Sequence, residues 1–210
     1  MKIVGFVGLI GSGKDTAADY LVRSHNYVRD SFAGSLKDAV SFIFGWDRIF
    51  LEGHTNEARA WREQIDPWWA ERLNMPHLTP RWVLQNWGTE VCRLGFHDQI
   101  WVASLEKRIL NRKQNTVISD VRFPNEIVAI KKLGGTIVRI KRGDDPVWFK
   151  YAVIMNAGPT HPDWVSASER IRMLGIHSSE TAWAGSDIDL TIENDGTIAD
   201  LHTKLLTLSN

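Results

Sequence analysis

The stretch GLIGSGKDT, residues 8–16, directly follows the apolar opening MKIVGFV and decides how the fold begins. Residues 3–7 are continuously apolar, which is typical of a strand covered on both faces in a parallel sheet. Gly8, Gly13 and Lys14 then fit the pattern G-x-x-x-x-G-K, and the residues after them carry apolar side chains at helical spacing. The sequence therefore predicts a strand, a glycine-rich turn and a helix in direct succession.

A turn of this kind, between a strand and a helix, is typical of phosphate binding. Its glycines let backbone N–H groups point at phosphate oxygens, and the helix N-terminus adds a positive end. Lys14 would lie along the β- and γ-phosphates of a nucleotide as a mobile point charge. The expected ATP-binding residues are Gly11, Ser12, Gly13, Lys14, Asp15 and Thr16. The alternative is an ordinary glycine-rich turn without a ligand.

One position departs from the usual phosphate-binding pattern. The residue after the lysine normally offers a hydroxyl to Mg²⁺, but here it is Asp15, and the hydroxyl follows one place later at Thr16. The Asp15 carboxylate either orients metal-bound water or caps the helix at its positive end. The sequence leaves both interpretations open.

The rest of the chain alternates short apolar runs with helical patterns. Such alternation predicts an α/β fold, with a mostly parallel sheet flanked by helices and joined by right-handed crossovers. Proline in the first turn marks two of the helix starts. The further strands are expected at residues 116–119, 136–140 and 189–192, and the further helices at 79–95, 98–112 and 124–133.

The length of 210 residues favours a single domain, residues 1–210. Residues 45–78 and 143–178 interrupt the alternation of strands and helices. Loops of such length without a role are uncommon in compact domains. We therefore expect a helical insert at 45–78 and a lid-like lobe at 143–178.

The amino-acid composition limits the binding partners and the cellular compartment that can be expected for the chain. Lysine plus arginine and aspartate plus glutamate each total 25, so no overall basic field predicts stable nucleic-acid binding or attraction to a membrane surface. No run approaches the roughly 20 apolar residues that a membrane helix needs. The lone Cys92 cannot form an internal disulfide, which suits a reducing cytoplasm. Small molecules are the expected partners, and the oligomeric state, a homodimer included, is left open.

A second signature, VISDVRFPNE, occupies residues 117–126. Asp120 stands at the carboxyl end of an expected strand, where open α/β sheets bind ligands, so its carboxylate could reach a Mg²⁺ ion through water. Two residues later, Arg122 carries a planar fork suited to phosphate. Alternatively, Asp120 and Arg122 brace the turn while Asn125 and Glu126 start a helix.

Five segments occur in an order that resembles bacteriophage deoxynucleoside monophosphate kinases. They are GSGKDT, SFAGSLKDAV, LQNWGTE, SDVRFPNE and HSSE, and they extend from residue 7 to about residue 180. The resemblance implies a P-loop kinase fold that passes a phosphoryl group from ATP, with Mg²⁺ as cofactor, to a deoxynucleoside 5′-monophosphate. A phage kinase of this kind would work in the host cytoplasm.

The resemblance also implies roles for individual residues. Lys14, Asp120 and Arg122 would be catalytic, with Asp120 holding the metal through water and Arg122 bridging donor and acceptor. Lys37 and Arg81 match family positions near the acceptor nucleotide. The cations matter more than any base, because the acceptor phosphate is already largely ionised near neutral pH, with a second pKa of about 6.

Three further residues are candidates for binding the base of the substrate. Gln85 and Thr89 are four residues apart and share a helix face with Arg81, so they line a base pocket or pack at a helix boundary. Trp148, in the lobe at 143–178, is a candidate stacking surface, and such stacking is worth roughly 1–3 kcal/mol. The roles of Arg142, His177 and Glu180 are left open.

Two other functions are compatible with the phosphate-binding turn. One is another small-molecule P-loop kinase, such as a dephospho-coenzyme A kinase, although such an enzyme is not expected to carry SDVRFPNE. The other is a non-catalytic module that binds a nucleotide without transferring phosphate. Turnover with deoxynucleoside monophosphates distinguishes the three.

Overall fold

The computed structural model describes residues 1–208. It divides into two compact units. The first unit contains Met1–Ser31 together with the chain from Glu106 onward, and the second unit is Phe32–Leu105. Each unit has its own hydrophobic core.

A five-stranded parallel sheet forms the centre of the first unit, with strand order β2-β3-β1-β4-β5. The central strand β1 is buried along its whole length, as its continuous apolar sequence predicts. The predicted α/β class with a parallel sheet is confirmed. The strands are β1 Ile3–Val7, β2 Val28–Asp30, β3 Thr116–Ile118, β4 Thr136–Lys141 and β5 Leu190–Glu193.

Helices cover both faces of this sheet. On one face, α1 (Lys14–Ser24) and α12 (Ile198–Leu205) bury Leu21 and Leu201 against Phe6 and other strand residues. On the opposite face, α8 (Pro124–Lys132) approaches Gly5, where an added Cβ would lie 2.7 Å from Ile130 Cδ1. The glycine in β1 therefore lets α8 pack closely on the sheet.

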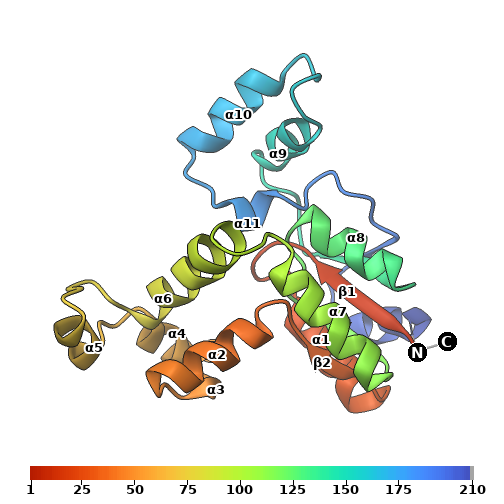
Figure 1. Ribbon diagram of the computed structural model, residues 1–210. Coiled ribbons are helices and arrows are strands. Elements are labelled where there is room, and N and C mark those ends of the chain that lie inside the picture. Colours follow the sequence, from red (N-terminus) through yellow and green to blue (C-terminus); the bar gives the residue numbers. More distant parts are fainter. Residues whose placement is uncertain (209–210) are drawn as a thin grey trace. The chain divides into compact units, whose positions relative to one another are not determined.

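The segment between β4 and β5 contains three further helices of the first unit. Figure 1 shows α9 (Phe149–Asn156) and α10 (Trp164–Met173) side by side, with the short α11 (Ser178–Thr181) following them. Ala152 and Ile171 join the two longer helices in a small apolar cluster. Trp148 packs against the same cluster.

The second unit is helical and rich in tryptophan. Trp46 and Trp101 are buried in its core, and Trp46 stacks on Phe44 with ring centroids 4.5 Å apart. The expected insert at 45–78 contributes α3, α4 and α5. The helices are α2 Gly34–Phe44, α3 Arg48–Glu52, α4 Asn56–Arg62, α5 Pro67–Arg72 and α6 Pro80–Asn86, and α7 Ile100–Arg112 begins in this unit.

The helix expected from residue 79 to 95 changes its form part-way. After α6 the chain continues as a π-helix, Trp87–Leu94, in which Gly95 N donates to Glu90 O, five residues back. The carbonyl of Gly88, within this π-helix, accepts a hydrogen bond of 2.9 Å from the indole nitrogen of Trp101. The Trp101 indole therefore donates to a carbonyl within the widened turn. The spacing of apolar residues in the sequence could not predict this contact.

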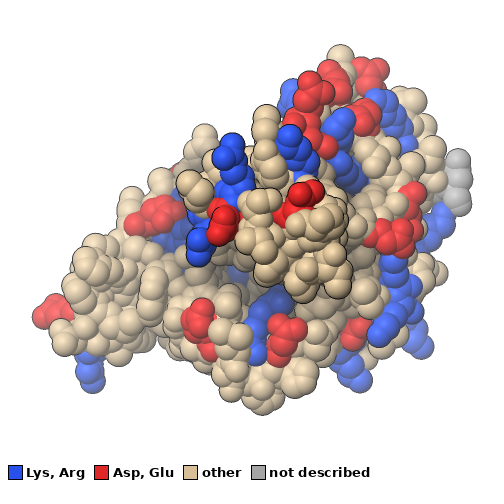
Figure 2. Space-filling view, turned by 90° about the horizontal axis from the view of Figure 1, so that it is seen from above, with Lys and Arg blue, Asp and Glu red and all other residues tan. Residues whose placement is uncertain are grey.

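Charges of both signs are interspersed over the face shown in Figure 2. This pattern agrees with the equal totals of acidic and basic residues in the sequence. Among the helices of residues 1–208, none combines the length and the apolar character that crossing a membrane requires.

Candidate functional site

The loop between β1 and α1, residues 8–16 and here called the phosphate loop, has a backbone that glycine makes possible. Gly8, Gly11 and Gly13 have φ values of 147°, 79° and 100°, which L side chains rarely adopt. A Cβ on Gly8 would also lie 2.3 Å from Ile140 O. Strain and contact together explain why the glycines occur at this spacing.

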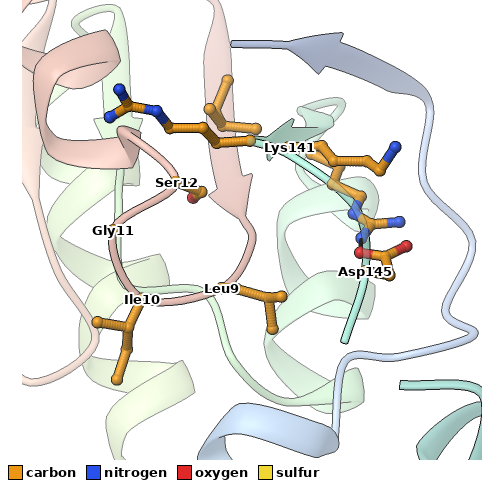
Figure 3. Close-up of a pocket in the computed structure, with 9 residues that line it drawn as sticks. Leu9, Ile10, Gly11, Ser12, Lys141 and Asp145 are labelled. Carbon is orange, nitrogen blue, oxygen red and sulfur yellow. Dashed lines mark hydrogen bonds and ion pairs between the residues drawn. The ribbon is translucent and has the colours of Figure 1, made fainter. Parts of the chain in front are cut away.

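Polar groups in the phosphate loop are only partly satisfied. The buried Ser12 hydroxyl has no hydrogen-bond partner among the described residues, and Figure 3 shows its side chain pointing into the loop. Lys14 Nζ donates to Gly8 O at 2.7 Å and to Leu9 O at 2.8 Å, so it lies over the same loop. A phosphate offers the acceptor oxygen that the Ser12 hydroxyl lacks and a negative charge beside the Lys14 ammonium, and the loop therefore fits this group.

The charge of Lys14 is costly in this position. Burial, and next the nearby charge of Arg122, lower the pKa of Lys14 to about 8, while Asp15 and Glu180 act in the opposite direction. A bound anion would favour the protonated ammonium and raise this pKa again. The protonation of Lys14 is thus strongly coupled to the binding of an anion in the phosphate loop.

Asn194 supports the phosphate loop from the end of β5. Its side-chain amide donates to Ser12 O at 2.8 Å, and a Cβ on Gly13 would lie 2.4 Å from Asn194 Nδ2. Sequence spacing does not connect Asn194 with the loop, because 182 positions separate it from Ser12. An asparagine just after an apolar strand was the available signal.

Asp15 is held by one side chain from β2 and one from the residue after β3. Its Oδ1 accepts from Arg29 at 2.7 Å and from the Ser119 hydroxyl at 3.0 Å, and the same arginine contacts Asp19 at 3.1 Å. The carboxylate therefore ties the start of α1 to the ends of β2 and β3. Thr16 follows Asp15 with an exposed side chain.

The two sequence signatures meet in one hollow of the first unit, called the Lys14 pocket. Lys14 from the phosphate loop lines it together with Asp120 and Arg122 from VISDVRFPNE, so the structure brings the three predicted catalytic residues together. Carboxylate oxygens are ligands that suit Mg²⁺, directly or through water. The complete lining is Gly8, Ile10, Lys14, Asp120, Val121, Arg122, Ser179, Glu180 and Trp183.

Arg122 is the half-exposed cation of this pocket. Half of its side chain is exposed, and its guanidinium donates to Ser179 Oγ at 3.2 Å and approaches Glu180 at 3.6 Å. The HSSE segment thus lies beside the VISDVRFPNE segment. His177 Nδ1 accepts from Ser179 N at 3.2 Å and caps α11.

The remaining part of VISDVRFPNE fixes the backbone. The buried Glu126 carboxylate accepts from Arg122 N at 2.8 Å and from Phe123 N at 3.1 Å, so it caps the start of α8. Pro124 occupies the first position of the same helix. This segment therefore carries both a structural acid, Glu126, and two groups that line the pocket.

A second hollow lies along the phosphate loop on the side of β4. Figure 3 shows Ile10, Gly11 and Ser12 of the loop on one side, and on the other Lys141 at the end of β4 and Asp145 beyond it. Arg142 also lines this hollow and is exposed. Trp148, the expected stacking residue, is half-buried, with its ring 6.0 Å from that of Phe149.

The other substrate-binding candidates belong to the second unit. Lys37 binds Glu52 at 2.5 Å, and Arg81 binds Glu63 at 3.2 Å. Gln85 is exposed on α6 with Arg81, while the exposed Thr89 lies in the π-helix, where the spacing of α-helical faces does not hold.

Comparisons with known proteins point to one family. A protein of Acanthamoeba polyphaga mimivirus with the provisional name deoxynucleotide monophosphate kinase is 32% identical over 156 residues, covering 68% of this chain and 75% of the relative. The deoxynucleoside-5′-monophosphate kinase of Escherichia phage T5 is 29% identical over 173 residues, covering 59% of this chain and 69% of the relative. No family model matches the sequence.

Solved structures show more distant similarity. Shikimate kinase from Aquifex aeolicus has 14% identity and a TM-score of 0.43, covering 99% of this chain and 94% of its own. Dephospho-CoA kinase from Campylobacter jejuni has 14% identity and a TM-score of 0.41, covering 99% and 95%. At this level, the substrates of these two kinases say nothing about the substrate of this chain.

Proposed function

Because the chain belongs to the deoxynucleoside monophosphate kinase family, we propose that it transfers the γ-phosphoryl group of ATP to a deoxynucleoside 5′-monophosphate. The observation that carries this proposal is the Lys14 pocket, where the phosphate loop, Asp120 and Arg122 line one hollow. ATP would lie with its phosphates in the loop. The second unit contributes the candidates for acceptor binding, namely Lys37, Arg81, Gln85 and Thr89, and the first unit contributes Trp148.

The proposed reaction needs no protein base. A phosphate oxygen of the acceptor, ionised near neutral pH, forms the new bond to the γ-phosphorus as the bond to the β-phosphate oxygen breaks. ADP leaves with the electron pair of that bond. The chain must therefore hold the two nucleotides in line and offset the repulsion between their phosphates. Positively charged groups can do this.

The site residues of the first unit have different roles in this arrangement. Lys14 leaves the carbonyls of Gly8 and Leu9 to follow the phosphates, and Ser12 donates its unpaired hydroxyl. Arg122, half-exposed, places its fork against the transferred group. When bound with ATP, Mg²⁺ would supply further positive charge, and Asp120 would hold it through water.

The nucleotides define the proposed setting. ATP and deoxynucleoside monophosphates are cytoplasmic metabolites, so we place the reaction in the cytoplasm, that of the host if a phage encodes the chain. Its proposed partners are these small molecules, without stable binding to nucleic acid. The equal totals of acidic and basic residues support this part of the proposal.

The direct test is ADP formation from Mg-ATP with dAMP, dCMP, dGMP or dTMP, and with dephospho-coenzyme A as the competing acceptor. We expect turnover with at least one of the four deoxynucleotides and none with dephospho-coenzyme A. Lys14→Ala should lose on the order of 10²-fold or more in kcat, while Lys132→Ala, an exposed lysine at the end of α8, should not change it. ADP formed only with dephospho-coenzyme A would refute the proposal.

A further inference from the structure

The second unit contains an arginine whose surroundings are unusual for a structural side chain. We infer that Arg62, together with Arg59 and Arg81, binds the 5′-phosphate of the acceptor nucleotide. This inference rests on the proposed function and deepens it, because it adds Arg62 and Arg59 to Arg81, the only one of the three that the sequence analysis placed near the acceptor nucleotide. All three arginines lie on α4 or α6, which are in contact within this unit.

The guanidinium of Arg62 is enclosed but poorly satisfied. Its Nε is buried and has no hydrogen-bond partner among the described residues, and its Nη1 reaches Leu51 O only at 3.5 Å. Buried donors are nearly always paired in folded proteins. An acceptor that comes from outside the chain would resolve this exception.

No carboxylate of residues 1–208 forms an ion pair with Arg62. The two acidic side chains whose charges act on Arg62 are already engaged, since Glu52 binds Lys37 at 2.5 Å and Glu63 binds Arg81 at 3.2 Å. Positive charge around Arg62 therefore exceeds negative charge. This surplus favours an anion rather than an internal salt bridge.

Two like charges, those of Arg81 and Arg59, act on Arg62. Burial first, and then the neighbouring charges of Arg81 and Arg59, lower the pKa of Arg62, while Glu63 and Glu52 act in the opposite direction. Proteins retain such repulsion where a ligand relieves it. A nucleotide phosphate, which carries about −1.5 to −2 charges at pH 7, would do so.

The fold makes room for this guanidinium with a glycine. A Cβ on Gly53 would lie 2.2 Å from both Cζ and Nη2 of Arg62. Gly53 also has a φ of 67°, and its carbonyl accepts from Arg59 Nε at 3.0 Å. The same turn therefore positions two of the three arginines.

Phosphate is the ligand whose chemistry fits these donors. A planar guanidinium donates two parallel hydrogen bonds to phosphate oxygens, and several arginines can surround one phosphate. A deoxynucleoside without the phosphate offers no such acceptor. The inferred site should therefore distinguish a deoxynucleoside monophosphate from the corresponding deoxynucleoside.

The first experiment measures steady-state kinetics of Arg62→Gln and Arg62→Lys with the preferred deoxynucleotide and with ATP. We expect the KM for the deoxynucleotide to rise about 10- to 100-fold in Arg62→Gln, and the KM for ATP to stay within about twofold. Inhibition by the corresponding deoxynucleoside should be unchanged. Arg72→Gln, which removes an exposed arginine of the same unit, should change none of these values.

The outcomes separate this inference from the function on which it rests. An unchanged deoxynucleotide KM in Arg62→Gln would overturn the inference and leave the proposed function standing. Equal weakening of ATP and deoxynucleotide would also overturn it, because a general loss of structure would then explain the effect. Absence of turnover by the unaltered chain with every deoxynucleotide would overturn both.

A glycine pair gives a second test that leaves every arginine in place. Gly53→Ala pushes the Arg62 guanidinium aside, whereas Gly45→Ala places a Cβ at a similar φ, 70°, with nothing within 4 Å. Backbone strain is thus matched between the two variants. We expect Gly53→Ala alone to raise the deoxynucleotide KM, by about tenfold. An equal KM in both variants would contradict the inference.

Discussion

The lowered pKa of Lys14 predicts that nucleotide binding weakens at alkaline pH. Burial and the charge of Arg122 lower this pKa to about 8 in the free protein. Phosphate binds the ammonium form, so occupation of the phosphate loop raises the pKa and couples binding to proton uptake. The affinity should therefore be full below pH 8 and should fall as pH rises above it.

The size of the effect follows from the protonated fraction of Lys14. With a pKa of about 8, roughly nine tenths of the molecules carry the ammonium at pH 7 and about one tenth at pH 9. The dissociation constant of ATP should thus rise about tenfold between these two pH values. About 0.9 proton should be taken up per ATP bound at pH 9.

Isothermal titration calorimetry with a non-hydrolysable ATP analogue measures both quantities, in two buffers of different ionisation enthalpy. Lys14→Arg is the matched control, because a guanidinium stays protonated over this range and its affinity should not vary with pH. A dissociation constant for the unaltered chain that stays constant from pH 7 to 9.5 would refute the reasoning. So would an equal pH dependence in Lys14→Arg.

Other predictions concern the supports of the phosphate loop and the core. Asn194→Ala removes the amide that donates to the loop, and the KM for ATP should rise about five- to tenfold in steady-state kinetics while the deoxynucleotide KM stays constant; equal changes in both would contradict a role in the loop. Asp15→Asn weakens the contacts with Arg29 and Ser119, and urea unfolding should show a loss of about 0.5–1 kcal/mol, since the pair is partly exposed. Leu21→Ala, fully buried between α1 and the sheet, should cost about 2–5 kcal/mol in the same assay, and a loss below 1 kcal/mol would refute its place in the core.

Local patterns were sufficient for the first strand, the phosphate loop and the helix after it. The spacing of the glycines predicted positive φ at Gly8 and Gly13, because glycine adopts such values readily. The continuous apolar run predicted that β1 is buried on both faces. The position of Asp120 at a strand end followed from the topology of parallel sheets. Its proximity to Lys14 then followed from the order of the strands.

Contacts between distant residues could not be read in this way. The partners of Asp15 are Arg29 and Ser119, which no sequence spacing connects to it. Asn194 meets the phosphate loop only because β5 lies two strands from β1 in the folded sheet. The Nε of Arg62 lacks a partner because of packing, which the sequence of α4 does not indicate.

The central claim is that the phosphate loop binds the phosphates of ATP, and a crystal structure with a non-hydrolysable ATP analogue tests it most directly. We predict phosphate oxygens within about 2.7–3.1 Å of backbone N–H groups of residues 11–14, with Lys14 Nζ moved from Gly8 O and Leu9 O onto the β- and γ-phosphates. A nucleotide bound elsewhere, with Lys14 still on the two carbonyls, would contradict the claim.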